Sequence, residues 1–407
     1  MVVQTSQRAA INWQSFNIGS QQELRINQPS AAAITLMRVV GPNPSQIAGR
    51  IDSNGMIVLT NGAGVVIYKG AQANDAGVVI SAPGITNENL MAGKMTFDRA
   101  AKPGATVEVA GDITVADGGP LTLLAPGVQS SGILDAQRGS VYLLGADTAT
   151  LNMTGHSPVT LGVPNQVTAA PANPSGALVS LTGQIQAQGG FVEVEGSAAD
   201  GLVENLVKIS GSVSTPTAGA ATGEITVGGI GGGALVTGTL AARGGAPGEA
   251  GGKVGIEASG TVALKGSAIV NTAGEAGGGV IAVGTTLARA EGGPSVMGES
   301  ISSEVTVGSG VKLNADALGN GAGGRVTLLA TGVDDFGGTI TATGGPHGGN
   351  GGFVEVSGNT VGLTGMVDVS APMGTTGTLL LDPVKLTCRL RGWNSPTPPP
   401  AGCVLAG

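Results

Sequence analysis

Short stretches of alternating apolar and polar residues recur along almost the whole chain. The segments "TVEVAGDITVADG", "EITVGG", "VTVGSGVKLNADA" and "MVDVSAP" each place Val, Ile or Leu at every second position. Alternation over four to six residues, bounded by Gly, Asn, Asp or Pro, is typical of short, half-buried β-strands. No segment has the periodicity of an amphipathic helix. The pattern therefore predicts an all-β protein built from many short strands.

A glycine motif marks where several of these strands are expected to begin. The tetrad Gly-Gly-x-aliphatic starts at residues 189, 251, 277, 323 and 351, so successive copies are 62, 26, 46 and 28 residues apart. A β-propeller would repeat more regularly, at about 40 residues with a tryptophan signature, and this chain lacks both. A loose period fits one coil per repeat with loops of variable length. We therefore predict a right-handed parallel β-helix whose glycines turn the corners at positive φ.

The composition makes the expected interior aliphatic. Hydrophobic residues form 41% of the 407 residues, charged residues only 11%, and glycine accounts for 74. Abundant β-branched residues with little charge argue against a disordered chain. Only nine aromatic residues occur, as expected of a narrow prism with little room for rings. We expect the rings to lie where the prism begins, ends or carries insertions.

Charge and cysteine usage exclude several classes of function. The net charge is −8 and no basic run occurs, so nucleic-acid binding lacks its electrostatic basis. No apolar stretch approaches the length of a membrane span. Two cysteines and two histidines far apart in the sequence do not form the ligand set of a metal site. We expect no metal and no cofactor.

Residues 1–55 differ from the rest in composition, with more Gln, Asn and Arg and fewer glycines. Trp13 and Phe16 lie three positions apart in this segment. The first coil of a β-helix exposes unpaired backbone groups that invite aggregation, and a bulky aromatic pair suits a lid over an aliphatic prism. Residues 1–55 are therefore predicted to form an N-terminal cap.

Ordered blocks of sequence then resemble a known family, the secretion domain of two-partner-secretion exoproteins of the filamentous haemagglutinin group (haemagglutination activity domain). The blocks are "INWQSFNIG", "NQPSAAAITLMRVVG", "PSQIAGRIDSNGMIVL", "KGAQ", "NENLMAGKMTF", "GGPLTLLAPGVQSSGILDAQRGSVYLL" and "GLVENLV", which cover roughly the first 210 residues in order. A later segment, "GGFVEVSGN…GMVDVSAPMGTTGTLLLDP", is similar to one found in large adhesins of the same group. One departure occurs where the family usually carries Asn-Pro-Asn-Gly. This chain has Asn61-Gly62-Ala63-Gly64, which we expect to turn at positive φ through Asn-Gly.

The resemblance implies recognition by a partner transporter in the outer membrane, passage of the unfolded chain and folding outside the cell. The residues expected to take part in recognition are Asn12, Trp13, Phe16, Asn17, Gln28, Arg38, Gln46 and Asn61. For each of them an alternative is that it only packs the cap or satisfies buried hydrogen bonds. The expected location is the bacterial cell surface or the extracellular space.

Beyond the cap we expect β-helix of the secretion domain over residues 56–210, further coils over 211–383 and a flap over 384–407. The motif Asp382-Pro383 is expected to end regular pairing, because proline lacks an N–H group. Cys388 and Cys403 are predicted to form a disulfide that closes the flap, as befits an oxidising compartment; two unreactive thiols are the alternative. Arg389, Arg391 and Trp393 form a basic–aromatic patch suited to a sugar or a neighbouring subunit, unless Trp393 only plugs the prism end.

The leading interpretation of function is a non-enzymatic secreted adhesin or extracellular fibre component that binds a host or bacterial surface glycan or protein. A second hypothesis is a filament or matrix protein that assembles by end-to-end stacking of the β-helix. A polysaccharide-degrading enzyme would need clustered carboxylates. The acidic pair Asp334 and Asp335 is interpreted as a solvated turn, and Glu193, Glu195 and Glu355 as solubilising residues on outer faces.

Overall fold

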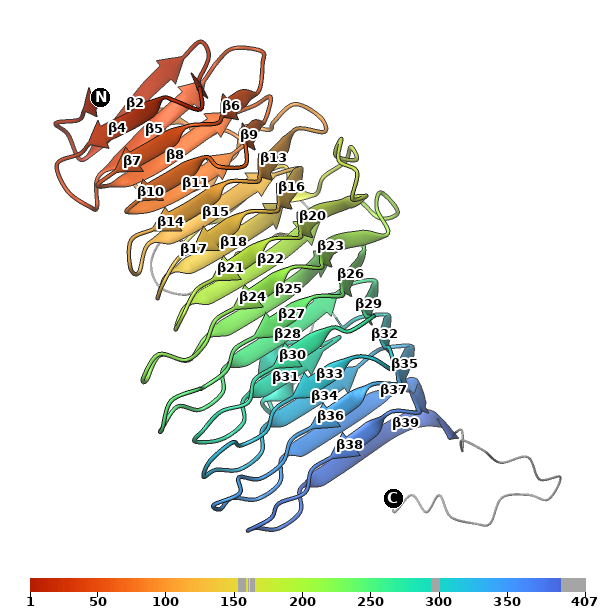
Figure 1. Cartoon of the computed structure of the whole chain (residues 1–407). Helices are drawn as coiled ribbons and strands as arrows, with labels where there is room; N and C mark the ends of the chain where they lie inside the picture. The colour runs from red at the N-terminus through yellow and green to blue at the C-terminus, as the bar shows by residue number, and fades with distance from the viewer. Residues whose placement is uncertain (153–158, 160, 162–164, 294–300, 389–407) are drawn as a thin grey trace.

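The computed structural model is an elongated parallel β-helix with the N-terminus at one end of the rod (Figure 1). The structure describes residues 1–152, 159, 161, 165–293 and 301–388. Successive coils contribute strands to three faces, and the strands of each face pair in parallel from one coil to the next. The predicted all-β parallel β-helix is confirmed.

The strands of the three faces are as follows. The first face consists of β2 (Arg8–Trp13), β5 (Ile34–Val39), β8 (Met56–Asn61), β11 (Gly77–Ser81), β15 (Pro120–Ala125), β18 (Ser140–Gly145), β22 (Phe191–Ser197), β25 (Glu224–Ile230), β28 (Lys253–Ala258), β31 (Val280–Val283), β34 (Arg325–Leu329) and the first parts of β37 (Phe353–Leu363) and β39 (Thr378–Cys388). The second face consists of β3 (Asn17–Ile18), β6 (Ser45–Ile47), β9 (Val65–Ile67), β13 (Thr106–Val109), β16 (Gly127–Ser130), β20 (Ala177–Leu181), β23 (Asn205–Ile209), β26 (Gly233–Val236), β29 (Thr261–Leu264), β32 (Glu304–Val307), β35 (Val333–Phe336) and the last parts of β37 and β39. The third face consists of β1 (Val2–Val3), β4 (Glu23–Asn27), β7 (Arg50–Ser53), β10 (Gln72–Asp75), β14 (Asp112–Val115), β17 (Ile133–Asp135), β21 (Gln184–Gln186), β24 (Ser212–Ser214), β27 (Thr239–Ala241), β30 (Ile269–Asn271), β33 (Lys312–Asn314), β36 (Thr339–Thr341) and β38 (Met366–Asp368).

Three insertions pack against the first face. The first carries α1 (Asn87–Met91) and β12 (Met95–Phe97), the second carries β19 (Ala149–Leu151), and the third carries α2 (Leu287–Ala290). β12 and β19 pair with each other in antiparallel fashion. Each helix begins at a threonine N-cap, Thr86 or Thr286, whose hydroxyl accepts a backbone N–H three residues later. Such short helices are too brief for the sequence to show a helical period. No helix among the described residues is long and apolar enough to cross a membrane.

Two hydrophobic cores result from this arrangement. Inward-facing Val, Ile, Leu and Ala fill the prism along its length. A second core lies outside the first face, where the first two insertions cover Leu36, Val58, Val79 and Leu124. The rings of Phe97, Tyr142 and Phe191 lie in this second core, as expected for aromatics near insertions. Phe336 is an exception because its ring is buried inside the prism itself.

The glycine tetrads lie at the starts of strands of the first face, but positive φ is not the reason for the glycine directly before each strand. A Cβ on Gly279 would lie 2.0 Å from the carbonyl oxygen of Gly252 one coil earlier, and a Cβ on Gly324 would lie 2.1 Å from that of Gly279. Gly352 and Gly377 continue the same column, at 2.2 and 2.0 Å. None of these four has a positive φ. The column exists because neighbouring coils approach too closely at this corner for any side chain.

The first 55 residues supply strands to the same three faces as the rest of the rod. β5 pairs with β8 and β7 pairs with β10, so the sheets continue across residue 55. Pairing also continues across residue 210 through β23 and β26. The domain boundaries expected at residues 55 and 210 therefore remain predictions. Within residues 1–55, Trp13 and Phe16 make an edge-to-face contact at 5.5 Å and pack against the prism core.

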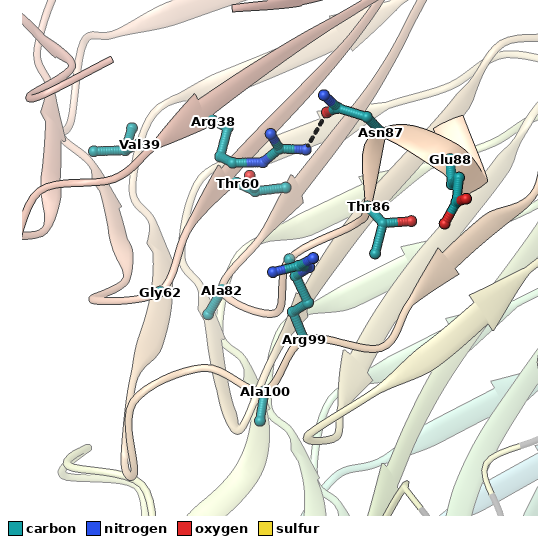
Figure 2. Close-up of a pocket in the computed structure, with 11 residues that line it drawn as sticks. Arg38, Val39, Thr60, Gly62, Ala82, Thr86, Asn87, Glu88, Arg99 and Ala100 are labelled. Carbon is teal, nitrogen blue, oxygen red and sulfur yellow. Dashed lines mark hydrogen bonds between the residues drawn. The ribbon is translucent and has the colours of Figure 1, made fainter. Parts of the chain in front are cut away.

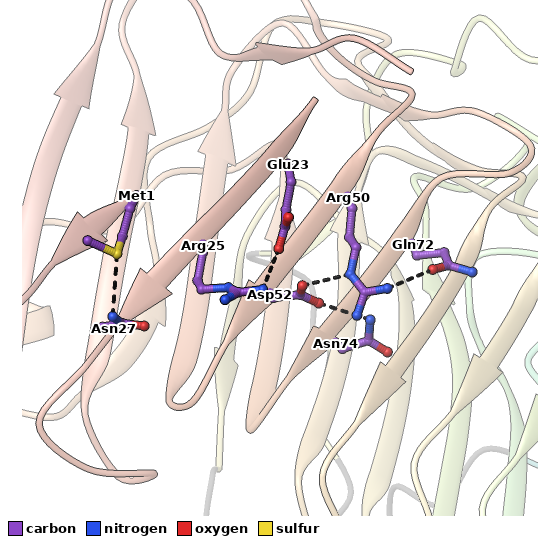
Figure 3. A network of polar contacts seen from close by, with 8 residues as sticks. All are labelled: Met1, Glu23, Arg25, Asn27, Arg50, Asp52, Gln72 and Asn74. Carbon is purple, nitrogen blue, oxygen red and sulfur yellow. Dashed lines mark hydrogen bonds and ion pairs between the residues drawn. The ribbon is translucent and has the colours of Figure 1, made fainter. Parts of the chain in front are cut away.

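Outward positions of the third face near the N-terminus form a polar network (Figure 3). Arg50 on β7 pairs with Asp52 at 2.6 Å and donates to Gln72 on β10 at 3.3 Å. Asn74 donates to the other carboxylate oxygen of Asp52 at 3.0 Å. Although burial opposes ionisation, the hydrogen bonds from Arg50 and Asn74 keep the pKa of Asp52 below its ordinary value. These contacts tie successive coils together on the solvent side.

Three interpretations of acidic residues were wrong. Asp334 lies inside the prism with no exposed surface, because β35 faces it inward in register with Val305 and Val361. Glu193 and Glu355 do point outward, but insertions cover them and leave only 2% and 4% exposed. Outward orientation implies exposure only where no insertion packs on the face.

The expected end of pairing at Asp382-Pro383 was also wrong. β39 continues through this dipeptide to Cys388, with Pro383 in register with Gly358. Among the described strands β39 pairs only with β37, and proline is tolerated in such a strand with one neighbour. Arg389, Arg391, Trp393 and Cys403 lie outside the described residues, so the proposed disulfide and aromatic patch remain predictions.

Candidate functional site

A cavity of about 500 Å³ opens on the first face near the N-terminal end of the rod (Figure 2). Its floor comes from β5 and β8, and its far wall comes from the first insertion. The lining residues are Arg38, Val39, Thr60, Gly62, Ala82, Gly84, Thr86, Asn87, Glu88, Arg99 and Ala100. Two arginines and one glutamate therefore face a hollow between the prism and α1.

Arg38 connects the prism to the first insertion across the cavity. Its guanidinium donates to the Ile85 carbonyl oxygen and to Asn87 Oδ1, both at 2.8 Å, and to Asn12 Oδ1 at 3.2 Å. Asn12, Arg38 and Thr60 occupy one register row across β2, β5 and β8. Partial burial, followed by the like charge of Arg99, lowers the pKa of Arg38. The cavity thus has a cationic character suited to a carboxylate or a backbone carbonyl group.

The turn at residues 61–64 borders this cavity through Gly62. Asn61 is fully buried; its amide donates to the Asn43 carbonyl oxygen at 3.1 Å and to Ser45 Oγ at 3.0 Å. Its Oδ1 accepts the Ala63 N–H at 2.9 Å. The positive φ expected at Asn-Gly lies instead at Gly64, whose φ is 105°. A Cβ at Gly64 would lie 2.5 Å from the Thr106 carbonyl oxygen, so glycine is required there on two grounds.

The other predicted recognition residues lie elsewhere on the first two coils. Exposed Asn17 accepts the backbone N–H of Gln46 at 2.8 Å and is its register partner. Gln28 is buried and donates to the carbonyl oxygens of Ala33 and Met56, at 3.0 and 3.1 Å. The structure therefore brings Asn12 and Arg38 together, pairs Asn17 with Gln46, and places the rings of Trp13 and Phe16 edge-to-face. It does not gather all eight into one site.

Thr86, Asn87 and Arg99 of the cavity wall were not predicted from the sequence. Thr86 begins a capped helix, and a threonine followed by the acidic Glu88 in the first turn was the available signal. No sequence signal pointed to Arg99. Its position depends on two backbone hydrogen bonds with Gly84, whose N–O distances are 2.7 and 3.1 Å. Among the described residues no group of three metal-ligating side chains occurs.

Comparison with known proteins identifies relatives of this chain. The family model described as the TPS secretion domain matches residues 1–226. The solved structure of the HMW1 secretion domain from Haemophilus influenzae superposes with a TM-score of 0.76 at 26% identity, covering 92% of this chain and 94% of that one. Two curated proteins, both named heme/hemopexin-binding protein, from Haemophilus influenzae and from its strain Rd, are 36% identical over 101 residues and 33% identical over 156 residues. The matches cover 25% and 36% of this chain, but only 11% and 17% of those relatives.

Proposed function

Because the chain belongs to the TPS secretion domain family, we propose that its first three coils carry the determinants that a partner outer-membrane transporter recognises. Membership in this family implies export to the cell surface or extracellular space through such a partner. The observation that carries the proposal is the family match over residues 1–226. The candidate determinants, from Asn12 to Asn61, all lie within the first three coils of that segment.

Burial divides six of these candidates into two classes, while Trp13 and Arg38 are half-buried. Asn12, Asn17 and Gln46 are exposed in the folded protein, so a transporter could contact them before or after folding. Phe16, Gln28 and Asn61 are buried, so a transporter could contact them only while the chain is unfolded. A buried residue that is required for export beyond its effect on stability would therefore indicate recognition of the unfolded chain.

The test is to replace Trp13 by Leu and Asn17 by Ala separately, and to measure both the secreted fraction and the free energy of unfolding of purified protein. We expect Asn17→Ala to reduce secretion several-fold with little change in stability, because its side chain is exposed. Gln188→Ala on a later coil, whose side chain is also exposed, serves as the matched control. Equal losses of stability and secretion in Trp13→Leu would assign Trp13 to packing alone. Normal secretion of both variants would refute recognition through these residues.

For the whole protein we propose a non-enzymatic surface role as an adhesin or fibre component. The elongated rod with few charged residues supports this proposal, since it presents an extended surface to a partner. Cells that export the chain should bind a host-cell or bacterial-surface preparation more strongly than cells lacking the transporter. Electron microscopy of concentrated protein separates the alternatives: isolated rods favour the adhesin, whereas long filaments favour end-to-end assembly. New reducing ends on a glycan panel would contradict the non-enzymatic role.

A further inference from the structure

A second cavity, of about 460 Å³, lies on the first face over β22, β25 and β28. The insertion that carries α2 forms one wall, and Val159 and Leu161 contribute to another. Among the described lining residues are four glutamates and no Lys, Arg or His: Glu193, Glu195, Glu224 and Glu257. This cavity is separate from the arginine-lined cavity near the N-terminus, with which it shares no lining residue.

Strand register explains how the carboxyl groups are brought together. Glu193 and Glu195 alternate on the outward side of β22. Glu195, Gly228 and Glu257 form one register row across three strands. Since Gly228 has no side chain, the row leaves a space between two acidic residues. In the adjacent register row, which begins at Glu193 on β22, Thr226 has a small side chain and Gly255 has none.

A buried hydroxyl provides a second, independent indication of a ligand. Thr285 lines the cavity and is 1% exposed, yet its Oγ1 has no hydrogen-bond partner among the described residues. A buried hydroxyl without a partner is unfavourable unless something binds to it. The carboxyl group of Glu193, in contrast, has a hydrogen-bond partner: both its oxygens accept the Val159 N–H, at 2.9 and 3.1 Å.

The chemistry of the walls narrows the class of ligand. Val159, Leu161 and Leu287 present apolar surface beside the carboxyl groups. An ammonium group offers three donors for carboxylate and hydroxyl oxygens, and an aliphatic chain attached to it packs against apolar walls. We propose that this cavity binds an alkylammonium group, with the nitrogen near Glu195 and Glu257 and the methylene groups near Leu161 and Leu287. The group could be that of a small diamine or of a lysine side chain on a partner.

The protonation of the glutamates supports this assignment. Burial raises the pKa of Glu193 to about 7. Burial, reinforced by Glu193 and then by the charge of Glu257, raises the pKa of Glu195 well above its ordinary value. The strands and the helix packed around these carboxyl groups carry five other charged or titratable residues: Tyr142 on β18, Glu224 on β25, Lys253 and Glu257 on β28, and Arg289 on α2. Lys253 pairs with Glu291, and Arg289 pairs with Glu355. A bound cation favours the ionised carboxylates, so binding should release protons and tighten as the pH rises.

The experiment is calorimetric titration of the full chain with 1,5-diaminopentane and with N-acetyl-lysine amide, using 1,5-pentanediol as the uncharged control. We expect saturable binding of an amine at pH 8, at least tenfold weaker binding at pH 6, and proton release detected by comparing buffers of different ionisation enthalpy. Glu195→Gln with Glu257→Gln should weaken binding at least tenfold. Glu204→Gln, an exposed glutamate, should leave binding unchanged. Preference for the diamine or for the lysine derivative distinguishes a free ligand from a partner side chain.

The proposal is overturned if neither amine binds, if the diol binds equally well, or if the double variant binds unchanged. Thermal unfolding of the double variant checks its fold. Since glutamine keeps the shape of glutamate without its charge, we expect no loss of stability. Proton release by the unmodified chain tests the proposal independently of any variant, and binding without proton release would also contradict it.

Discussion

Asp334 is in register with Val361 of the following coil, inside the aliphatic prism. Val305 precedes it in the same column on the previous coil. The Asp334 carboxyl is fully buried and neither oxygen has a hydrogen-bond partner among the described residues. Burial, followed by the charge of neighbouring Asp335, raises the pKa of Asp334 to about 8. An otherwise apolar column of the core thus contains a carboxyl group, which is uncharged only when it is protonated.

The stability of the rod should therefore fall as the pH rises. Because folding raises the pKa of Asp334 above its value of about 3.9 in an unfolded chain, the folded state holds its proton more tightly. This contribution is fully present below about pH 4 and is lost as the pH rises through about 8, by up to ~1.4 kcal/mol per pH unit. Asp334→Asn should flatten the dependence of the unfolding free energy on pH, measured with denaturant between pH 5 and 9.

Exposed Asp335→Asn is the matched control, and most of the pH dependence should persist in it. Burial also raises the pKa of Asp75, to about 7, and the pKa values of Glu193 and Glu195, so part of the pH dependence of stability should remain in Asp334→Asn. An unchanged slope in Asp334→Asn would show that this carboxyl does not titrate in the folded protein.

Gly279→Ala should destabilise the rod. Its new Cβ would lie 2.0 Å from the Gly252 carbonyl oxygen, and backbone on both coils would have to move. We expect a loss of roughly 1–3 kcal/mol in the unfolding free energy. In Gly245→Ala the Cβ meets no heavy atom within 4 Å, so the change should stay within about 0.5 kcal/mol. Similar values for both variants would contradict the close-approach explanation.

Arg38→Met should release the first insertion from the prism. The variant loses the bonds to Ile85 and Asn87 that hold the start of α1. Hydrogen exchange of amides in residues 85–92 should accelerate at least tenfold, while exchange in β15 and later strands stays unchanged. Arg99→Met is the control, since no hydrogen bond from its guanidinium occurs among the described residues, and it should leave exchange near α1 unaltered. Equal protection in Arg38→Met and the unmodified chain would refute this anchoring role.

Asn61→Ala should weaken the turn beside the arginine-lined cavity. The substitution leaves Asn43, Ser45 and Ala63 without their buried amide partner. The expected loss in unfolding free energy is about 1–3 kcal/mol. Exposed Asn17→Ala, which removes one hydrogen bond, should lose less than about 1 kcal/mol. A smaller loss for Asn61→Ala than for Asn17→Ala would contradict this structural role.

The sequence by itself determined the fold class, because its signal is local. Alternation such as Val107, Glu108, Val109 places one side of a strand in an apolar interior regardless of what pairs with it. Glycine tetrads correctly marked strand starts, and ordered blocks such as "INWQSFNIG" identified the family. The scarcity of aromatic residues correctly indicated an aliphatic prism, with most rings near its start or its insertions.

Only the tertiary structure decided what covers each outward position. Glu193 and Asp112 both point away from the prism by alternation, yet only Glu193 is covered by an insertion. Alternation likewise could not reveal that Asp334, unlike Asp335, points inward, because a one-residue change of register reverses the faces. The arginine-lined cavity joins Arg38 to Asn87 across 49 residues of sequence, and the glutamate-lined cavity joins three strands and two insertions. These sites depend on where insertions fold back onto the first face, and that depends on long-range packing, which no local pattern encodes.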